Sequence, residues 1–297
     1  MIKTFQRSWQ LTKLTFRVIG QDKEMLLFPL VGGVCSLALA AALLFPTVVT
    51  SLTAPGAGAG APGASTLSAM DYVVLVATYF ALAFIATFFN VCVVHTARTR
   101  FEGGNATFGD SIRVAWSKVS LIAMWSLVAA TVGLLLRALD ALAERLGGAG
   151  ELVMSILTSL LGLAWSVIVL FVVPGMVYRD LGPIAAIKSA VTTLRRTWGE
   201  TAVRHFGLGL MQFLFLALGA GLGFVLVTLL GSLGTAGVIT ALAITAVYIL
   251  GVILVFNVAN SVFATALYAY ANGYALPADF DTDTLSQAFR PRRRGLM

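Results

Sequence analysis

Two histidines and four acidic residues near the ends of apolar segments are the side chains best placed to do chemistry. They are His95, His205, Glu102, Asp110, Asp180 and Glu200. Brought together in the fold, such groups could exchange protons with a substrate or hold a metal ion. Zinc needs three or four ligands, however, and carboxylates at helix ends are ordinarily solvated or cap the helix. We therefore predict no catalytic residue, no cofactor-binding residue and no metal site.

The two cysteines, Cys35 and Cys92, both lie within long apolar segments. Their positions place them at different depths in a membrane, which disfavours a disulfide bond between them. We expect two buried free thiols that behave as small hydrophobic side chains.

Charged residues are missing from the central part of every long apolar segment, which disfavours a proton relay through buried carboxylates. The polar groups at depth are amides and hydroxyls: Asn90, Gln212, Asn257, Asn260, Ser126, Thr131 and Ser166. Hydrogen bonds between helices explain such groups, and we predict that role for them. Contact between the Asn residues and a transported solute is the alternative.

The positions of these residues depend on six apolar runs, each of about 20 residues or more, which is the length of a membrane-spanning helix. The chain is 59% hydrophobic and only 11% charged. We predict an all-α, polytopic membrane protein that forms one domain over residues 1–297, with spans at about 25–47, 71–96, 118–138, 152–176, 203–230 and 236–262. The last helix is expected to continue to Tyr270.

The basic residues lie almost entirely on one side of this predicted topology. Eighteen of the twenty Lys and Arg residues precede the first run, follow the last, or occupy the loops after the second and fourth. Only Arg137 and Arg145 lie elsewhere. Since basic loops stay in the cytoplasm, we predict a cell-membrane protein with both termini and the tail 271–297 cytoplasmic. The net charge of +7 is then a topology signal that can attract anionic lipid, and nucleic acid is not expected as a partner.

Three stretches on the predicted cytoplasmic side have the pattern of amphipathic helices: residues 1–20, 108–119 and 184–198. In the second, Phe108, Ile112, Trp116 and Val119 share one face, opposite Arg113 and Lys118. In the third, Ile184, Ile187, Val191, Leu194 and Trp198 lie opposite Lys188, Arg195 and Arg196. Such helices suit the headgroup layer of a membrane, or they pack on the end of the bundle, or both. With two spans after each, they form a weak threefold repeat.

The connections on the other side differ in kind. Residues 51–69 form an uncharged linker rich in Gly, Ala and Pro, and residues 139–151 form a loop. Residues 231–235 form a tight Gly-containing turn that makes a close hairpin of spans five and six. We expect Pro174-Gly175 to end the fourth span.

The chain resembles the domain of unknown function 6159 family, whose members are prokaryotic multi-pass membrane proteins. The resemblance rests on segments that occur in order between about residues 5 and 215. They are DKEMLLFPL (22–30), FFN (88–90), FEGGNATFGD (101–110), WSLVAATVGLLLR (125–137), LAWSV (163–167), FVVPG (171–175), LGPIAAIKSA (181–190) and TWGE (197–200). The resemblance implies a fold and carries no activity with it.

Two functions are compatible with these features. The first is a non-catalytic membrane component that organises lipid, including anionic headgroups, or a protein partner or second copy at the cytoplasmic face. The second is a transporter or channel for a small neutral or amphiphilic solute, favoured by the repeat and the intramembrane Asn residues. We expect no enzyme activity; a cavity that brought together Glu102, His95, Asp180 or Glu200 would change that view.

Overall fold

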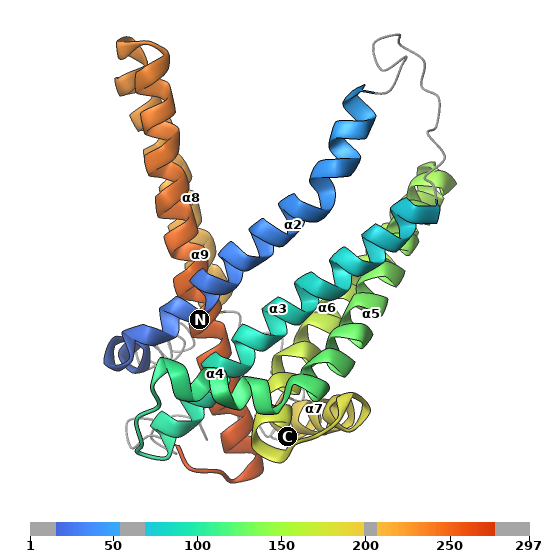
Figure 1. Ribbon diagram of the computed structural model, residues 1–297, viewed down its shortest axis with the longest axis vertical. Helices are drawn as coiled ribbons and strands as arrows, with labels where there is room; N and C mark the ends of the chain where they lie inside the picture. Colours follow the sequence, from blue (N-terminus) through green and yellow to red (C-terminus); the bar gives the residue numbers. More distant parts are fainter. Residues whose placement is uncertain (1–15, 54–68, 199–206, 277–297) are drawn as a thin grey trace, which may run out of the picture. The chain divides into compact units, whose positions relative to one another are not determined.

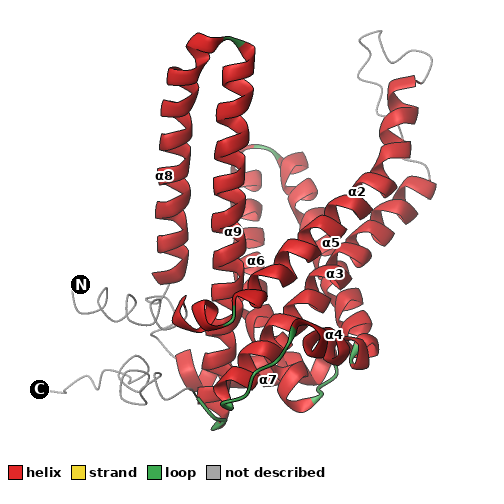
Figure 2. Cartoon of the chain, turned by 60° about the vertical axis from the view of Figure 1, so that its left-hand side comes forward, coloured by secondary structure: helices red, strands yellow, loops and turns green. Residues whose placement is uncertain are grey.

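The computed structural model describes residues 16–53, 69–198 and 207–276, and this part of the chain consists of helices and turns without a strand (Figure 2). The elements, labelled in Figure 1, are η1 (Lys23–Leu26), α2 (Leu27–Thr53), α3 (Ala69–Phe101), α4 (Phe108–Ser117), α5 (Val119–Leu146), α6 (Gly148–Arg179), α7 (Pro183–Trp198), α8 (Gly207–Leu230), η3 (Gly231–Leu233) and α9 (Thr235–Asn272). Residues 16–21 are also helical, and the rest of the predicted helix 1–20 lies outside the described residues. The all-α prediction is confirmed.

In the part of the chain that the structure describes, six helices are long and apolar enough to cross a membrane, as predicted. Their apolar stretches are Lys23–Leu43, Tyr72–Phe101, Val119–Leu146, Gly148–Arg179, Gly209–Leu233 and Thr235–Asn272. Helical structure is the expected form because hydrocarbon offers no hydrogen-bond partner to an exposed peptide group. The predicted linker is shorter than expected, since α2 continues to Thr53 and α3 begins at Ala69. Residues 54–68 lie outside the described part.

The predicted loop 139–151 is wrong. Helix α5 continues to Leu146 and α6 begins at Gly148, so that Gly147 is the only residue between them. Gly147 has a φ of 62°, a conformation that glycine adopts without steric cost. Polar and charged residues in this stretch suggested a loop. They lie instead in helical turns that extend α5 and α6 beyond their apolar parts.

The prediction that Pro174 ends a span is also wrong. Pro174 lies inside α6, which continues to Arg179 and ends at Asp180 in the left-handed conformation, with φ 51°. The residues around Pro174, from Phe171 to Val177, are buried. A proline removes one helical hydrogen bond, and close packing of the surrounding turn is able to offset that loss.

The chain forms two compact units. The first consists of Met1–Pro29, Val93–Phe108 and Thr192–Met297, and the second of Leu30–Cys92 and Gly109–Val191. The second unit contains the α5–α6 hairpin. Helix α3 packs closely on α5 there, since a Cβ atom at Gly133 would lie 3.8 Å from Cδ1 of Tyr79. The first unit contains the α8–α9 hairpin, in which the two helices run side by side in both views (Figures 1 and 2).

Glycine allows close contact between α8 and α9. A Cβ atom at Gly223 would lie 2.5 Å from Cγ2 of Thr245, and one at Gly219 would overlap the ring of Tyr248. The Tyr248 hydroxyl donates a hydrogen bond of 3.3 Å to the Phe215 carbonyl of α8. The predicted tight turn is confirmed: η3 is followed by Gly234 with a φ of 81°.

Helix α9 has two parts with different surroundings. Its 38 residues extend about 57 Å, almost twice the roughly 30 Å of a bilayer core. The part paired with α8 is largely exposed, whereas most residues between Phe256 and Ala269 are buried in the first unit. There Phe16 packs edge-on against Phe256, with 5.7 Å between ring centroids. An uncharged sequence of this length therefore serves first as a span and then as the core of a protein unit.

We predict that Gly223→Ala destabilises the α8–α9 hairpin. The added methyl group meets Thr245, whose branched side chain has little rotamer freedom in a helix, and overpacking costs about 1–3 kcal/mol. The measurement is the midpoint of thermal unfolding of the purified protein in detergent.

Gly221→Ala is the matched control for this variant. It lies on the same helix, and no atom lies within 4 Å of its added Cβ, so its midpoint should equal or exceed that of the wild type. Equal midpoints for the two variants would contradict the close packing of the hairpin.

Candidate functional site

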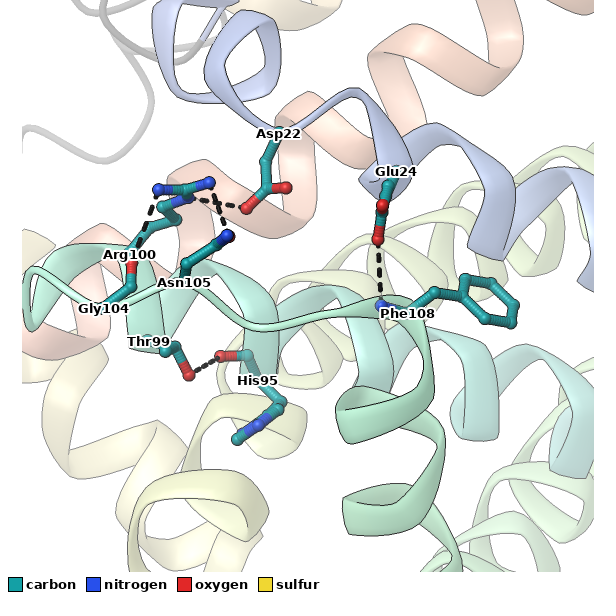
Figure 3. A network of polar contacts seen from close by, with 8 residues as sticks. All are labelled: Asp22, Glu24, His95, Thr99, Arg100, Gly104, Asn105 and Phe108. Carbon is teal, nitrogen blue, oxygen red and sulfur yellow. Dashed lines mark hydrogen bonds and ion pairs between the residues drawn. The ribbon is translucent and has the colours of Figure 1, made fainter.

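A network of polar contacts in the first unit is centred on Arg100, near the end of α3 (Figure 3). Its guanidinium donates to Asp22 Oδ2 at 2.6 Å, to Asn105 Oδ1 at 2.7 Å and to the Gly104 carbonyl at 3.5 Å. A guanidinium has five N–H donors that point in different directions in one plane, so it can bind three acceptors at once. The network therefore joins the segment before η1 to the turn that follows α3.

The ion pair between Arg100 and Asp22 is largely shielded from solvent. The Asp22 side chain is 7% exposed and that of Arg100 is 25% exposed. A carboxylate at this depth requires a partner, because an unpaired buried charge costs several kcal/mol. The chain places Asp22 at the end of the helical residues 16–21, so the ion pair fixes where that helix ends and η1 begins.

The start of α4 is capped by a residue distant in the sequence. Glu24 Oε2 accepts a hydrogen bond of 2.9 Å from the Phe108 N–H, one of the amide groups that a helix start leaves without a partner (Figure 3). Phe28 stacks on Phe108, with 4.7 Å between centroids and 7° between planes. The spacing of Thr107 and Asp110 resembles a capping box and agrees with a helix start at Phe108, whereas nothing in the sequence indicates Glu24.

The residues predicted as candidates for chemistry have varied surroundings. Glu102 forms an exposed ion pair with Arg98 one turn earlier, at 2.8 Å. Close by, the Thr99 hydroxyl donates to the His95 carbonyl at 3.0 Å (Figure 3). Asp110 lies in the first turn of α4. Glu200 and His205 lie outside the described residues. Within the described ranges, no three His, Cys, Asp or Glu side chains gather as metal ligands.

A third ion pair lies in the second unit, between Lys118 and Asp180. Lys118 is the single residue between α4 and α5, and Asp180 is the first residue after α6. The Lys118 side chain is only 12% exposed, so it does not point to solvent as its predicted polar face required. Because α5 and α6 are antiparallel neighbours, the ion pair joins the two ends from which α4 and α7 emerge.

The packed faces of α4 and α7 agree only in part with the predicted apolar faces. The fully buried residues are small: Ser111 and Ala115 in α4, and Ala186, Ala190 and Thr193 in α7. The predicted apolar residues Phe108, Ile112, Ile187, Val191 and Leu194 are half-buried beside them. Trp116 and Ile184, which we also expected on the apolar faces, are 61% and 71% exposed. The helices are present as predicted, and small side chains allow them to approach the protein closely.

Hydroxyl groups within the spans bond to their own helices. Ser126 donates to the Ile122 carbonyl at 2.7 Å, Thr131 to that of Leu127 at 2.8 Å, and Ser166 to that of Leu163 at 2.8 Å. Bonds between helices were predicted for these three residues, so that prediction is wrong. A hydroxyl three or four residues after a carbonyl reaches it without a neighbouring helix.

The amides behave differently from the hydroxyls. Oδ1 of Asn90 is buried without a hydrogen-bond partner, and Asn257 is an exposed residue of α9. An unsatisfied acceptor costs about 1–3 kcal/mol, so Asn90 lowers the stability of the second unit in this conformation.

The two cysteines also differ from each other. Cys92 is a buried free thiol, as predicted, and donates to the Ser111 carbonyl at 3.6 Å. Cys35 is an exposed residue of α2, so the prediction of two buried thiols is wrong for this one. An outer position on a span explains the difference, since a thiol is apolar enough for lipid as well as for a core.

A family model matches residues 69–275, which contain α3 to α9, the turn around Arg100 and both residues of the Lys118–Asp180 ion pair. The chain belongs to the family of unknown function DUF6159. The match begins later than the expected resemblance and extends further along the chain, to residue 275, while Asp22 and Glu24 precede it. No curated protein matches the chain.

We predict that Asp22→Asn lowers the free energy of unfolding by roughly 3 kcal/mol, since it leaves a largely buried Arg100 without its anionic partner. Denaturation of the purified protein in mixed micelles, followed by circular dichroism, provides the measurement.

Glu102→Gln is the matched control, because it removes an ion pair of similar geometry that is exposed to solvent. Exposed pairs contribute only about 0.2–1 kcal/mol. If Asp22→Asn cost no more than Glu102→Gln, the Arg100 network would not be a determinant of the fold.

Proposed function

We propose that this protein is a non-catalytic component of the cell membrane that organises anionic lipid at its cytoplasmic face. Organisation of a protein partner at the same face is the alternative form of this proposal. The observation that supports the proposal most is the attachment of α4 and α7 to one end of the α5–α6 hairpin, with large apolar and basic side chains exposed on both.

Short connections confine α4 and α7 to the surface of the membrane. One residue separates α4 from the span α5, and three residues separate the span α6 from α7. Such connections reach no more than about 3.5 Å per residue, so neither helix can move far from the headgroup layer. The Lys118–Asp180 ion pair further joins the two connections.

The exposed side chains are those that an anionic membrane surface attracts. Trp116 is exposed one turn after the exposed Arg113, and Ile184 one turn before the exposed Lys188. Basic amphipathic helices with aromatic or aliphatic anchors bind in the headgroup layer, where each Lys or Arg contributes about 1 kcal/mol toward anionic lipid. Two helices with this pattern make lipid organisation the function that best fits the second unit.

We predict that Arg113→Gln combined with Lys188→Gln weakens the preference for anionic lipid. Spin-labelled phosphatidylglycerol and phosphatidylcholine, added to protein reconstituted in phosphatidylcholine, report this preference as the ratio of their immobilised fractions. Removal of each charge should lower the ratio by up to about fivefold, the equivalent of about 1 kcal/mol.

Arg137→Gln combined with Arg145→Gln is the matched control. It removes two exposed basic residues near the opposite end of the α5–α6 hairpin, and it should leave the ratio almost unchanged. A wild-type protein without preference for phosphatidylglycerol would refute lipid organisation by charge. A lost preference in both double variants would mean that net charge, and not α4 and α7, causes the binding.

The orientation of the protein is tested separately. Fusion of a reporter that is active only in the cytoplasm should give signal at the C-terminus and no signal at residue 60, because the basic segments remain on the cytoplasmic side. The same reading at both positions would refute the proposed topology.

Transport of a small neutral or amphiphilic solute is a second candidate, favoured by the unpartnered Oδ1 of Asn90. A polar group that reduces stability can be retained for binding. We predict that Asn90→Leu raises the thermal midpoint, since it removes the unsatisfied acceptor and keeps the number and branching of the side-chain heavy atoms. A lower midpoint would show that the amide stabilises the protein in its membrane form, and would remove the support for a binding role.

A further inference from the structure

We propose that Trp116 lies at the glycerol level of the bilayer and marks the edge of the hydrocarbon on the side of α4. This inference rests on the proposed function in one respect: it treats α4 as a helix of the membrane surface. It adds the depth at which the second unit lies in the membrane, and it assigns the lipid glycerol region as the partner of the Trp116 indole.

The surroundings of Trp116 are those of an interfacial anchor. Its ring packs edge-on against Phe88 of α3, with 5.5 Å between centroids and 71° between planes, yet the residue is 61% exposed. An indole that is apolar over its faces and polar at its N–H is most stable where hydrocarbon meets water. The contact with Phe88 holds one edge of this ring pair against α3 and leaves most of the Trp116 side chain exposed.

The neighbours of Trp116 along the chain agree with this depth. Arg113, one turn earlier, is exposed and suits the phosphate layer, and Val119, three residues later, begins the span α5. Lys118 between them is held by Asp180. The polypeptide therefore passes from a basic residue through an aromatic one into an apolar helix within two turns.

The opposite edge of the hydrocarbon is marked on the same helix that carries Phe88. Tyr72 is 54% exposed at the other end of the apolar part of α3 and directly follows Asp71. Phe88 follows Tyr72 by 16 positions, a rise of about 24 Å along the helix, which approaches the roughly 30 Å of a bilayer core. Tyr72 and Trp116, which packs on Phe88, are thus separated by about the distance between the two aromatic belts of a membrane protein.

This placement changes the meaning of Asn90 and of the residues that follow it. Asn90 lies two residues after Phe88, so the proposal places it near this edge of the hydrocarbon and not at the midplane. Arg98 and Arg100 follow at about 15–18 Å beyond Phe88 along the helix and therefore lie outside the hydrocarbon. The end of α3 is therefore a protein-buried extension of a span, as the second part of α9 is.

Fluorescence quenching by brominated lipid tests the depth of Trp116. Wild-type protein and Trp116→Phe are reconstituted in neutral phosphatidylcholine that carries bromine near the start, the middle or the end of the acyl chain. The difference between their spectra is the emission of Trp116. With this subtraction, the other four tryptophans need not be replaced. We expect this emission to be quenched most by the bromine nearest the headgroup.

Trp125→Phe is the matched control, since Trp125 is 1% exposed and stacks on Trp165. Its difference emission should be quenched little at any bromine position. Strongest quenching of Trp116 by bromine at the end of the acyl chain would overturn the proposal, and so would the absence of quenching at every position.

The outcome is separable from that of the proposed function because neutral lipid is used. Shallow quenching of Trp116 without preference for phosphatidylglycerol would retain the depth assignment and refute organisation of anionic lipid. A preference for phosphatidylglycerol with no quenching of Trp116 would retain the function and refute the anchor.

Discussion

Hydrocarbon solvates neither a charge nor an unpaired peptide group, and the architecture of this protein follows from that constraint. The peptide groups are satisfied within long helices, and the charged side chains lie outside the central part of each span. Cations and carboxylates at the helix ends then meet at close range. In both compact units, the ion pairs Asp22–Arg100 and Lys118–Asp180 join the end of one helix to the start of another segment.

These ion pairs explain how the short helices are positioned. Lys118 and Asp180 join the two ends of the α5–α6 hairpin from which α4 and α7 emerge, and Glu24 caps the first residue of α4. Small residues on α4 and α7 face the protein, which leaves Trp116 and Ile184 at the surface beside basic residues. The proposed lipid-organising role is a consequence of this arrangement, since both helices are tied to spans by connections of one and three residues.

The hydrophobic pattern predicted the number, order and approximate bounds of the spans because each needs about 20 apolar residues. Charged and proline residues caused the errors in their ends. Arg145 and Glu144 suggested a loop where α5 continues, and Pro174 suggested an end inside α6. A periodic pattern shows that a helix has two faces, but it identified the packed face of α4 only in part, since the small residues Ser111 and Ala115 are buried there in place of Trp116. Contacts distant in sequence, such as Glu24 with Phe108, had no signal in the sequence at all.

Six apolar helices were therefore predictable from the sequence alone, since apolar run length decides what can reside in lipid. Membership of the family was predictable from the resemblance of particular segments. The tertiary structure decided which charges are neutralised, which face of each surface helix is covered, and that Asn90 lacks a partner while the neighbouring hydroxyls bond to their own helices. The physical reason is one of range. Partition between water and lipid depends on each segment by itself, whereas ion pairs, caps and packed faces depend on which segments meet in space.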